Sequence, residues 1–474
     1  MARRSSRLSA SAAQSELAKS LAALRVQLGV PGEYPAAAEE EARQASDAPL
    51  GSLPDLTELA FLTIDPAGST DLDQAMHVRA TDAGFEVHYA IADVPFFVTP
   101  AGALDAETRR RGQTLYAPDG RIPLHPPVIS EGAGSLLPGQ RRRAFVWRFS
   151  LAPDGTVTAT SLTRAIVMSR RQWSYDEAQR ALDDGNAPPE LAPLPAIGKA
   201  LIAQEAARGG ASLNTPDQEV VLTPQGYGVE RRVPLPIEDW NAQLSLLTGM
   251  AAARIMLDGG VGILRTMPPA DDAAIAAFRA RTELLGLPWV PGVEYGAYLR
   301  GLDRAQPHAL AVLQAAASLF RGAGYEAFDG APPAQPVQAA LAAPYAHVTA
   351  PLRRLVDRWG LVICEALTAG NPVPEWVRAS LPELPHIMNV TTSLSARLDS
   401  GAIDRVEAAV LSGRVGEEFD AVVLAQNHTK TRIQLAEPAV EASVDSIAGN
   451  PGDVVRVRLV STSIATGALV FTPA

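Results

Sequence analysis

The chain has 474 residues, of which 47% are hydrophobic and 20% charged, a profile of folded globular proteins that excludes a largely disordered chain. A formal net charge of −11 excludes a protein that coats nucleic acid with its whole surface, although it allows a local basic channel. No apolar run approaches the ~20 residues that span a bilayer, and a single cysteine excludes an internal disulfide, so a cytoplasmic protein without a membrane partner is predicted.

The first fifty residues have helical periodicity, with apolar residues three and four apart in SAAQSELAKSLAALRVQL. They predict a helix-turn-helix-like unit or a packing arm. From about 56 to 165, runs such as LAFLTID and FEVHYAIADV predict strands separated by turns. Helices are expected at about 238–257, 270–285, 295–321 and 351–369.

Five short β-rich runs follow residue 405, and their combined length suits a small closed barrel of the OB type. The predicted fold class is therefore α+β, with a mixed sheet and packed helices between two smaller units. The expected domains are a helical segment at 1–50, a catalytic domain at 51–405 and a barrel at 406–474.

Three acids in residues 63–74 are the main candidates for chemistry. An apolar strand runs into Asp65, and a tight excursion leads to Asp71 and Asp73, which flank Leu72. An extended backbone places these last two carboxylates on one face, and all three converge if the loop folds back. Such acids repel unless a cation lies among them, and Mg²⁺ held this way can activate water for phosphodiester cleavage.

Two alternatives apply to this segment on spacing alone. The aspartates and serine can satisfy backbone donors in an ordinary surface turn. A calcium loop is the other, but the alternating acids, central glycine and final glutamate of an EF-hand are missing.

The segment FLTIDPAGSTDLDQAM resembles the signature of the ribonuclease II / ribonuclease R (RNB) family of 3′→5′ exoribonucleases. Four further segments resemble that family in the same order, over about residues 53–405. The resemblance implies an RNB-type catalytic domain followed by an RNA-binding OB-type barrel. Fifty helical residues cannot hold the cold-shock barrels that usually come first, so a variant lacking them is expected. The four segments are YAIADVPFFV, RRRGQTLYAPDGRIPLHP, SLLPGQRRRAFVWRF and PYAHVTAPLRRLVDRW.

By this resemblance, Asp65, Asp71 and Asp73 are the metal-binding and catalytic carboxylates, with Mg²⁺ as the cofactor and Mn²⁺ as an alternative. The family usually has a fourth aspartate next, where this chain has Gln74. An amide can ligate a metal or orient water, but it cannot act as a base. The number of metals is therefore left open.

The resemblance also assigns residues to the RNA. Arg353 matches the arginine that contacts phosphate and Arg354 the basic residue after it, although the pair can instead bridge acids such as Asp357. Tyr116 matches an aromatic that stacks on a base, although a lone tyrosine is more often packing. Gln243 stands where the family has an acid and is a candidate contact for the terminal nucleotide.

The function implied is hydrolysis of single-stranded RNA from its 3′ end, one nucleotide at a time, to 5′-mononucleotides. A monomer with no obligate protein partner is expected. One rival is a catalytically weak RNA-binding or regulatory protein on the same fold. The other is a metal phosphodiesterase that acts on DNA or small nucleotides.

Overall fold

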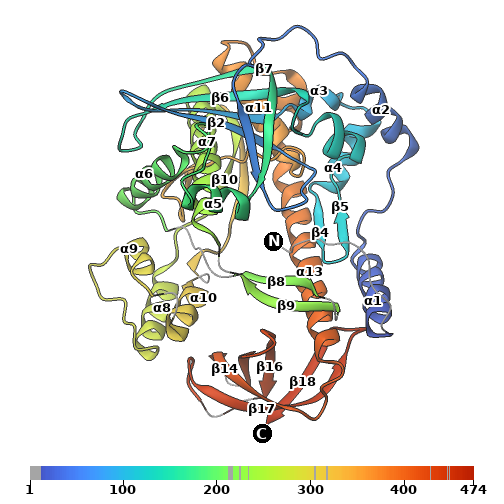
Figure 1. The fold of residues 1–474 in the computed structure, drawn as a ribbon, viewed down its shortest axis with the longest axis vertical. Coiled ribbons are helices and arrows are strands. Elements are labelled where there is room, and N and C mark those ends of the chain that lie inside the picture. Colours follow the sequence, from blue (N-terminus) through green and yellow to red (C-terminus); the bar gives the residue numbers. More distant parts are fainter. Residues whose placement is uncertain are drawn as a thin grey trace.

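The structure is a computed structural model that describes residues 12–211, 217–223, 226–232, 234–303, 306–316, 319–426, 429–445, 447 and 449–474. A larger body contains a β-barrel, a smaller body is a curled β-sheet, and one long helix, α13 (Leu384–Leu411), runs between them (Figure 1). The predicted α+β class is confirmed. Residues 1–11 of the predicted N-terminal segment lie outside the described residues.

Five strands close into the barrel, in the order β1-β2-β3-β6-β7. Neighbours are antiparallel except β1 and β7, which run parallel with Asp65 beside Ser174. Pairing is mixed, as predicted, and closure leaves the sheet without a free edge. Successive side chains of β3 serve two cores, since Val87 and Tyr89 lie in one apolar cluster and Ala90 in another. The strands are β1 (Phe61–Asp65), β2 (Gln74–Thr81), β3 (Gly84–Ala92), β6 (Arg141–Leu151) and β7 (Val157–Ser174).

A layer of helices packs against the barrel and shares its larger core. Helix α7 starts at Pro236, whose fixed φ suits a first helical position, and ends before Gly260, whose φ of +70° caps the last turn. The helix expected at 238–257 is confirmed. Cys364 of α11 is buried. The layer comprises α5 (Tyr175–Asp183), α6 (Leu194–Ala207), α7 (Pro236–Gly259), α11 (Leu355–Thr368), α12 (Glu375–Ser380) and η3 (Leu381–Glu383).

The single helix expected at 295–321 is wrong, because the structure has two shorter helices there. The first ends before Gly301, and the second begins at Pro307. A proline disfavours helical backbone in the residue before it, so the chain restarts a helix instead of continuing one. This part contains α8 (Asp272–Leu284), α9 (Tyr295–Arg300), α10 (Pro307–Ala316), β8 (Asp217–Thr223), β9 (Gly226–Arg232), β10 (Val261–Thr266), β11 (Gly324–Asp329), β12 (Val337–Gln338) and β13 (Ala343–Pro344).

The C-terminal body is a five-stranded antiparallel sheet in the order β16-β15-β14-β17-β18. It curls until it is nearly closed, which confirms the predicted OB-like unit. The boundary expected after residue 405 falls inside α13, since that helix continues to Leu411. The strands are β14 (Glu418–Gln426), β15 (Lys430–Leu435), β16 (Glu441–Asp445), β17 (Val454–Ser463) and β18 (Ala468–Pro473).

The N-terminal helices pack against different parts of the chain. Helix α1 lies along α13 (Figure 1), whereas α2 packs against α4 and η1. Within the described residues, each of the two helices thus makes its main contacts with a different part of the chain. Among the helices of the described residues, none has both the length and the hydrophobicity to cross a bilayer. The elements are α1 (Ala12–Leu28), α2 (Ala36–Ser46), α3 (Val94–Phe97), α4 (Ala103–Arg111), β4 (Leu115–Ala117), β5 (Gly120–Ile122) and η1 (Ile129–Ala133).

Candidate active site

The loop between β1 and β2 folds back at one end of the barrel. Its turn is closed by a hydrogen bond from the Ser69 N–H to the Pro66 carbonyl, and Gly68 supplies the positive φ of +80° that this turn requires. The Ser135 hydroxyl donates to the Thr70 carbonyl and accepts from the Leu72 N–H, at 2.7 and 2.9 Å. Hydrogen bonds to Ser135 therefore fix the loop in this position, and the loop brings Asp65 and Asp73 to the same end of the barrel.

Asp73 is almost fully buried, with 5% of its surface exposed. One carboxylate oxygen accepts from the Leu352 N–H at 2.7 Å, and the other lies 3.7 Å from Nε of Arg353. Burial nevertheless holds the pKa of Asp73 well above its usual value, with Asp71 adding to the rise, while Arg353 and the Leu352 bond oppose it. The two favourable contacts do not compensate for the desolvation of this carboxylate.

Asp65 ends strand β1 and is half-buried. Burial and the neighbouring charge of Asp71 raise its pKa to about 7, and only Arg353 opposes them. No hydrogen bond within the described residues offsets this cost. The charged form of such a carboxylate is unfavourable at neutral pH, and a nearby cation would stabilise it.

Asp71 already has a cationic partner. Its carboxylate forms an ion pair with Arg121, and the Tyr116 hydroxyl lies 3.5 Å away on the other oxygen. Arg121 also pairs with Glu131. Accordingly, within the part of the chain that the structure describes, no group of three or more acidic, histidine or cysteine side chains stands ready to hold a metal. Of the three predicted acids, Asp65 and Asp73 are thus left with unfavourable charged forms, whereas the charge of Asp71 is balanced by Arg121.

Arg121 was not singled out from the sequence. It lies opposite Tyr116 in the hairpin of β4 and β5, and cross-strand partners present their side chains on the same face. The APDG turn between the two strands was the signal that could have found it. If Tyr116 faces the acids, its partner across the turn must face them as well.

The two neighbouring arginines have different environments. Arg353 is 30% exposed and reaches toward Asp73, so its guanidinium is accessible to a phosphate. Arg354 makes two hydrogen bonds to Asp357, both 2.9 Å long, and its side chain is only 16% exposed. Asp357 raises the pKa of Arg354 above its usual value. Arg354 therefore fixes the loop to the start of α11, which was the alternative considered from the sequence.

Both glutamine candidates have their amides in internal hydrogen bonds. The Gln74 amide donates to the Thr349 carbonyl, and its oxygen accepts from the Tyr89 hydroxyl at 3.0 Å. Gln243 is buried and donates to Glu205 at 2.9 Å. These contacts join β2 to the loop before α11, and α7 to α6. Both amides are thus engaged in packing contacts, although Gln74 was a predicted ligand and Gln243 a predicted nucleotide contact.

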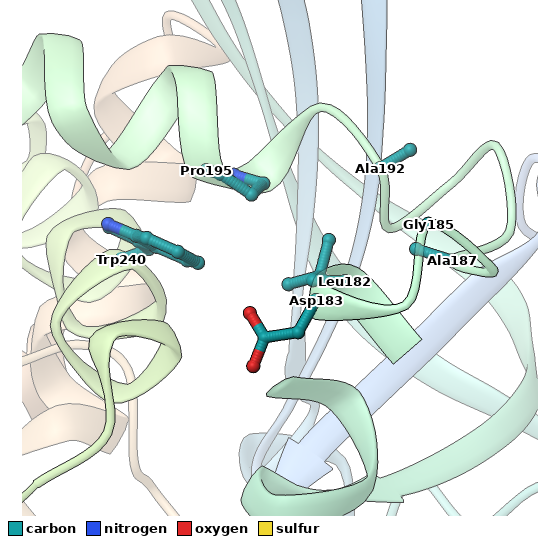
Figure 2. A pocket seen from close by; sticks show the side chains of 7 residues that line it. All are labelled: Leu182, Asp183, Gly185, Ala187, Ala192, Pro195 and Trp240. Carbon is teal, nitrogen blue, oxygen red and sulfur yellow. The ribbon is translucent and has the colours of Figure 1, made fainter. Parts of the chain in front are cut away.

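A cavity of about 300 Å³ lies among α5, α6 and α7 and is separate from these residues (Figure 2). Asp183 is the one charged residue of its lining, and its carboxylate accepts from Gln179 at 2.9 Å. The rest of the lining is apolar or glycine. None of the predicted site residues lines this cavity, so its chemistry does not compete with the acids at the barrel end. The lining residues are Leu182, Asp183, Gly185, Ala187, Ala192, Pro195 and Trp240.

The acids fit a hard divalent cation. Carboxylates are the protein ligands that Mg²⁺ prefers, and Asp65 and Asp73 are the two whose charged forms burial most disfavours here. A cation between them would reverse that penalty. Asp71 would join only by giving up its contact with Arg121.

Metal-free Asp65→Asn is expected to be more stable than the wild type at pH 8, by roughly 1–3 kcal/mol, because the buried charge is removed. The pKa of Asp65 is about 7 in the folded chain against 3.8 as its ordinary value. The folded state thus binds more protons between these pH values, so wild-type stability falls as pH rises through them. Urea unfolding in EDTA at pH 4 and pH 8 measures this, and the difference should vanish at pH 4.

Two comparisons complete this experiment. Exposed Asp82, changed to asparagine, serves as the matched control, and its stability should follow the wild type at both pH values because Asp65 is still present. Added Mg²⁺ should then stabilise the wild type more than Asp65→Asn. Equal pH profiles for wild type and Asp65→Asn would show that the carboxyl is not held in the environment described.

Residues 54–365 match the model of the RNB domain, which is more than half of the chain. The chain belongs to the RNB family. Residues 417–474 match the RNase II-type exonuclease C-terminal S1 domain, which is the curled C-terminal sheet. The family resemblance and the OB-like terminal unit that the sequence predicted are both confirmed.

The relatives of this RNB chain include proteins named as nucleases and one named as inactive. DIS3-like exonuclease 2 and inactive exonuclease DIS3L2, both of Arabidopsis thaliana, are each 41% identical over 155 residues, covering 32% of this chain and 14% of theirs. Ribonuclease R of Mycoplasma pneumoniae is 33% identical over 187 residues, covering 38% of this chain and 26% of that protein. These alignments span well under half of each relative's length.

The solved structure of Mycoplasma genitalium RNase R in complex with ribose methylated single-stranded RNA has the same fold. Its TM-score is 0.87 at 18% identity, and the match covers 97% of this chain and 78% of that one. Such a match places the barrel, the helical layer and the S1 unit in one architecture. The RNB fold of this chain is thus shown over nearly its whole length.

Proposed function

We propose that this RNB chain is a metal-dependent exoribonuclease that hydrolyses single-stranded RNA from the 3′ end and releases 5′-mononucleotides. The observation that carries the proposal is the meeting of Asp65, Asp73 and Arg353 at one end of the barrel. Two carboxylates whose charged forms are disfavoured by burial lie beside an accessible guanidinium. This arrangement suits a cation, a phosphate and a water between them. We further propose that the chain acts as a cytoplasmic monomer.

The proposed roles follow from these contacts. Asp65 and Asp73 would hold Mg²⁺, which supplies a water of lowered pKa and neutralises the leaving 3′ oxygen. Arg353 would lie on the scissile phosphate and offset the charge that develops there. Tyr116 would stack on a base, a contact that tolerates any sequence. Asp71 would become a third ligand only when it gives up its ion pair with Arg121.

Three observations support the rival function of an RNA-binding protein with little catalysis. The third acid is paired with Arg121, and Gln74 replaces the fourth. One relative is named an inactive exonuclease. The rival keeps the same fold and the same RNA surface, so only an activity measurement separates the two.

The purified chain, incubated with 5′-labelled single-stranded RNA and Mg²⁺, is expected to shorten the labelled RNA stepwise. EDTA should stop the reaction. With RNA labelled along its whole length instead, labelled mononucleotides should appear from the first time points, as removal of one residue at a time requires. Binding of the RNA without shortening at any Mg²⁺ or Mn²⁺ concentration would favour the RNA-binding rival. A matched DNA oligomer tests the second rival, because equal or faster cleavage of DNA contradicts recognition of the 2′-hydroxyl.

A further inference from the structure

The N-terminal arm, defined here as residues 12–35, touches both the C-terminal sheet and the β4–β5 hairpin. On one side, the Ser20 hydroxyl donates to the Ile464 carbonyl at 2.8 Å, in the turn between β17 and β18. Arg405 of α13 donates to the same hydroxyl at 3.0 Å. On the other side, Arg25 forms an ion pair with Asp119, at the tip of the hairpin. One helix thus contacts both regions directly.

One apolar cluster lies beneath these polar contacts. Buried leucines of α1 pack with Leu115 of the hairpin, with residues of α13 and with Ile464 of the S1 unit. Ile122, the cross-strand partner of Leu115, packs against the same cluster. The two hairpin strands are therefore held by their apolar residues. The buried members are Leu17, Leu21, Leu24, Leu115, Leu398, Ala402, Val406 and Ile464.

The rest of the arm contacts the chain just after strand β5 of the hairpin. The Tyr34 hydroxyl donates to the Pro123 carbonyl at 2.5 Å. Arg111, which is 2% exposed, donates to the Gly32 carbonyl at 2.6 Å and to the Pro123 carbonyl at 3.2 Å. Its guanidinium also lies 3.7 Å over the Tyr34 ring. These buried contacts define one position for the end of the hairpin.

The other residues of the same hairpin meet the catalytic end of the barrel. Side chains alternate along a strand, so Tyr116 lies opposite in direction to the clustered Leu115. Tyr116 and its cross-strand partner Arg121 both reach Asp71. The base of the hairpin is bonded to the loop of Arg353, since the Thr114 N–H donates to the Arg353 carbonyl at 3.0 Å. The hairpin thus lies between the arm and the site.

We propose that the N-terminal arm is a positioning element that fixes the β4–β5 hairpin over the acids and couples its position to the S1 unit. The proposal rests on the proposed function for its kinetic consequences, but its mechanical part does not. When the arm loses its hold, Tyr116 and Arg121 move together. The contact of Tyr116 with the RNA base then weakens, which raises KM and lowers kcat/KM, and the ion pair between Arg121 and Asp71 loosens.

The test is a charge reversal with a rescue. Arg25→Glu places like charges at the hairpin tip, and Arg25→Glu with Asp119→Arg restores an opposite pair. Arg43→Glu is the matched control, because Arg43 is exposed on α2 and pairs with Glu40 of its own helix. We expect kcat/KM on single-stranded RNA to fall roughly threefold to tenfold in Arg25→Glu and to recover in the double variant, since repulsion replaces a partly exposed ion pair.

Hydrogen exchange of residues 115–122 is measured on the same proteins without RNA or metal. Exchange should quicken in Arg25→Glu, return in the double variant and stay at the wild-type rate in Arg43→Glu. Unchanged exchange and unchanged kinetics in Arg25→Glu would overturn the proposal, as would a fall in melting temperature with no change in either. If the wild type cannot cleave RNA, the proposed function fails while the exchange result still decides the role of the arm.

Discussion

Asp73→Asn is expected to abolish the stepwise shortening of RNA, with kcat falling by roughly 10³-fold or more. Asparagine has nearly the same shape, and its side-chain oxygen can still accept the hydrogen bond from the Leu352 N–H. What is lost is the negative charge beside Asp65 that a divalent cation requires. A gel time course with 5′-labelled RNA and Mg²⁺ measures the rate, and a binding titration with the same RNA should give an affinity close to that of the wild type.

The control for this substitution is Asp82→Asn, which removes the same charge from an exposed turn of the barrel. It should keep the wild-type rate. Equal shortening by Asp73→Asn and the wild type would mean that the wrong carboxylate has been assigned. Loss of both binding and folding would instead show that the charge of Asp73 is needed for the fold, so the melting temperature of each variant is measured alongside.

Arg353→Ala is expected to lower kcat/KM by roughly 10²–10³-fold, because a guanidinium beside the scissile phosphate stabilises charge that grows in the transition state. Arg353→Lys should recover part of this loss, since it restores the charge without the planar fork. Arg353 lowers the pKa values of Asp65 and Asp73. Its removal therefore raises both, and the rising limb of the pH–rate profile should move to higher pH. Initial rates across pH 5–9 measure both effects.

Arg79→Ala is the matched control for Arg353→Ala, because Arg79 is an exposed barrel arginine that pairs with Glu86. It should leave the rate and the pH profile unchanged. A fall in rate without a shift of the pH–rate profile would mean that Arg353 contacts the phosphate but does not alter the pKa values of the acids. A wild-type rate in Arg353→Ala would contradict the assignment altogether.

Helix α7 and strand β1 were predictable from the sequence for local reasons. Hydrophobic periodicity, a starting proline and an ending glycine are encoded within one segment, so α7 matches its expected range. The strand that runs into Asp65 was equally clear, because apolar residues precede the acid directly. The split between α9 and α10 was visible in principle, since Pro307 stands inside the region read as one helix.

The partners of the site residues depended on long-range packing. Asp71 and Arg121 are fifty residues apart, and only the hairpin brings them into contact. Arg353 and Arg354 have the same chemistry and adjacent positions, yet one is accessible and the other is bonded to Asp357. The fold around each side chain, not its identity, determines which of them can meet a phosphate.

The sequence by itself determined the α+β class, the family resemblance, the acidic loop and the terminal OB-like unit. Each of these depends on residue types and spacing within a short window, which fix the local backbone. Only the tertiary structure decided that Arg121 holds the third acid, that Gln74 and Gln243 are internally bonded, and that α1 lies between the S1 unit and the hairpin. Such contacts join distant segments, and burial sets their strength, so no local pattern encodes them.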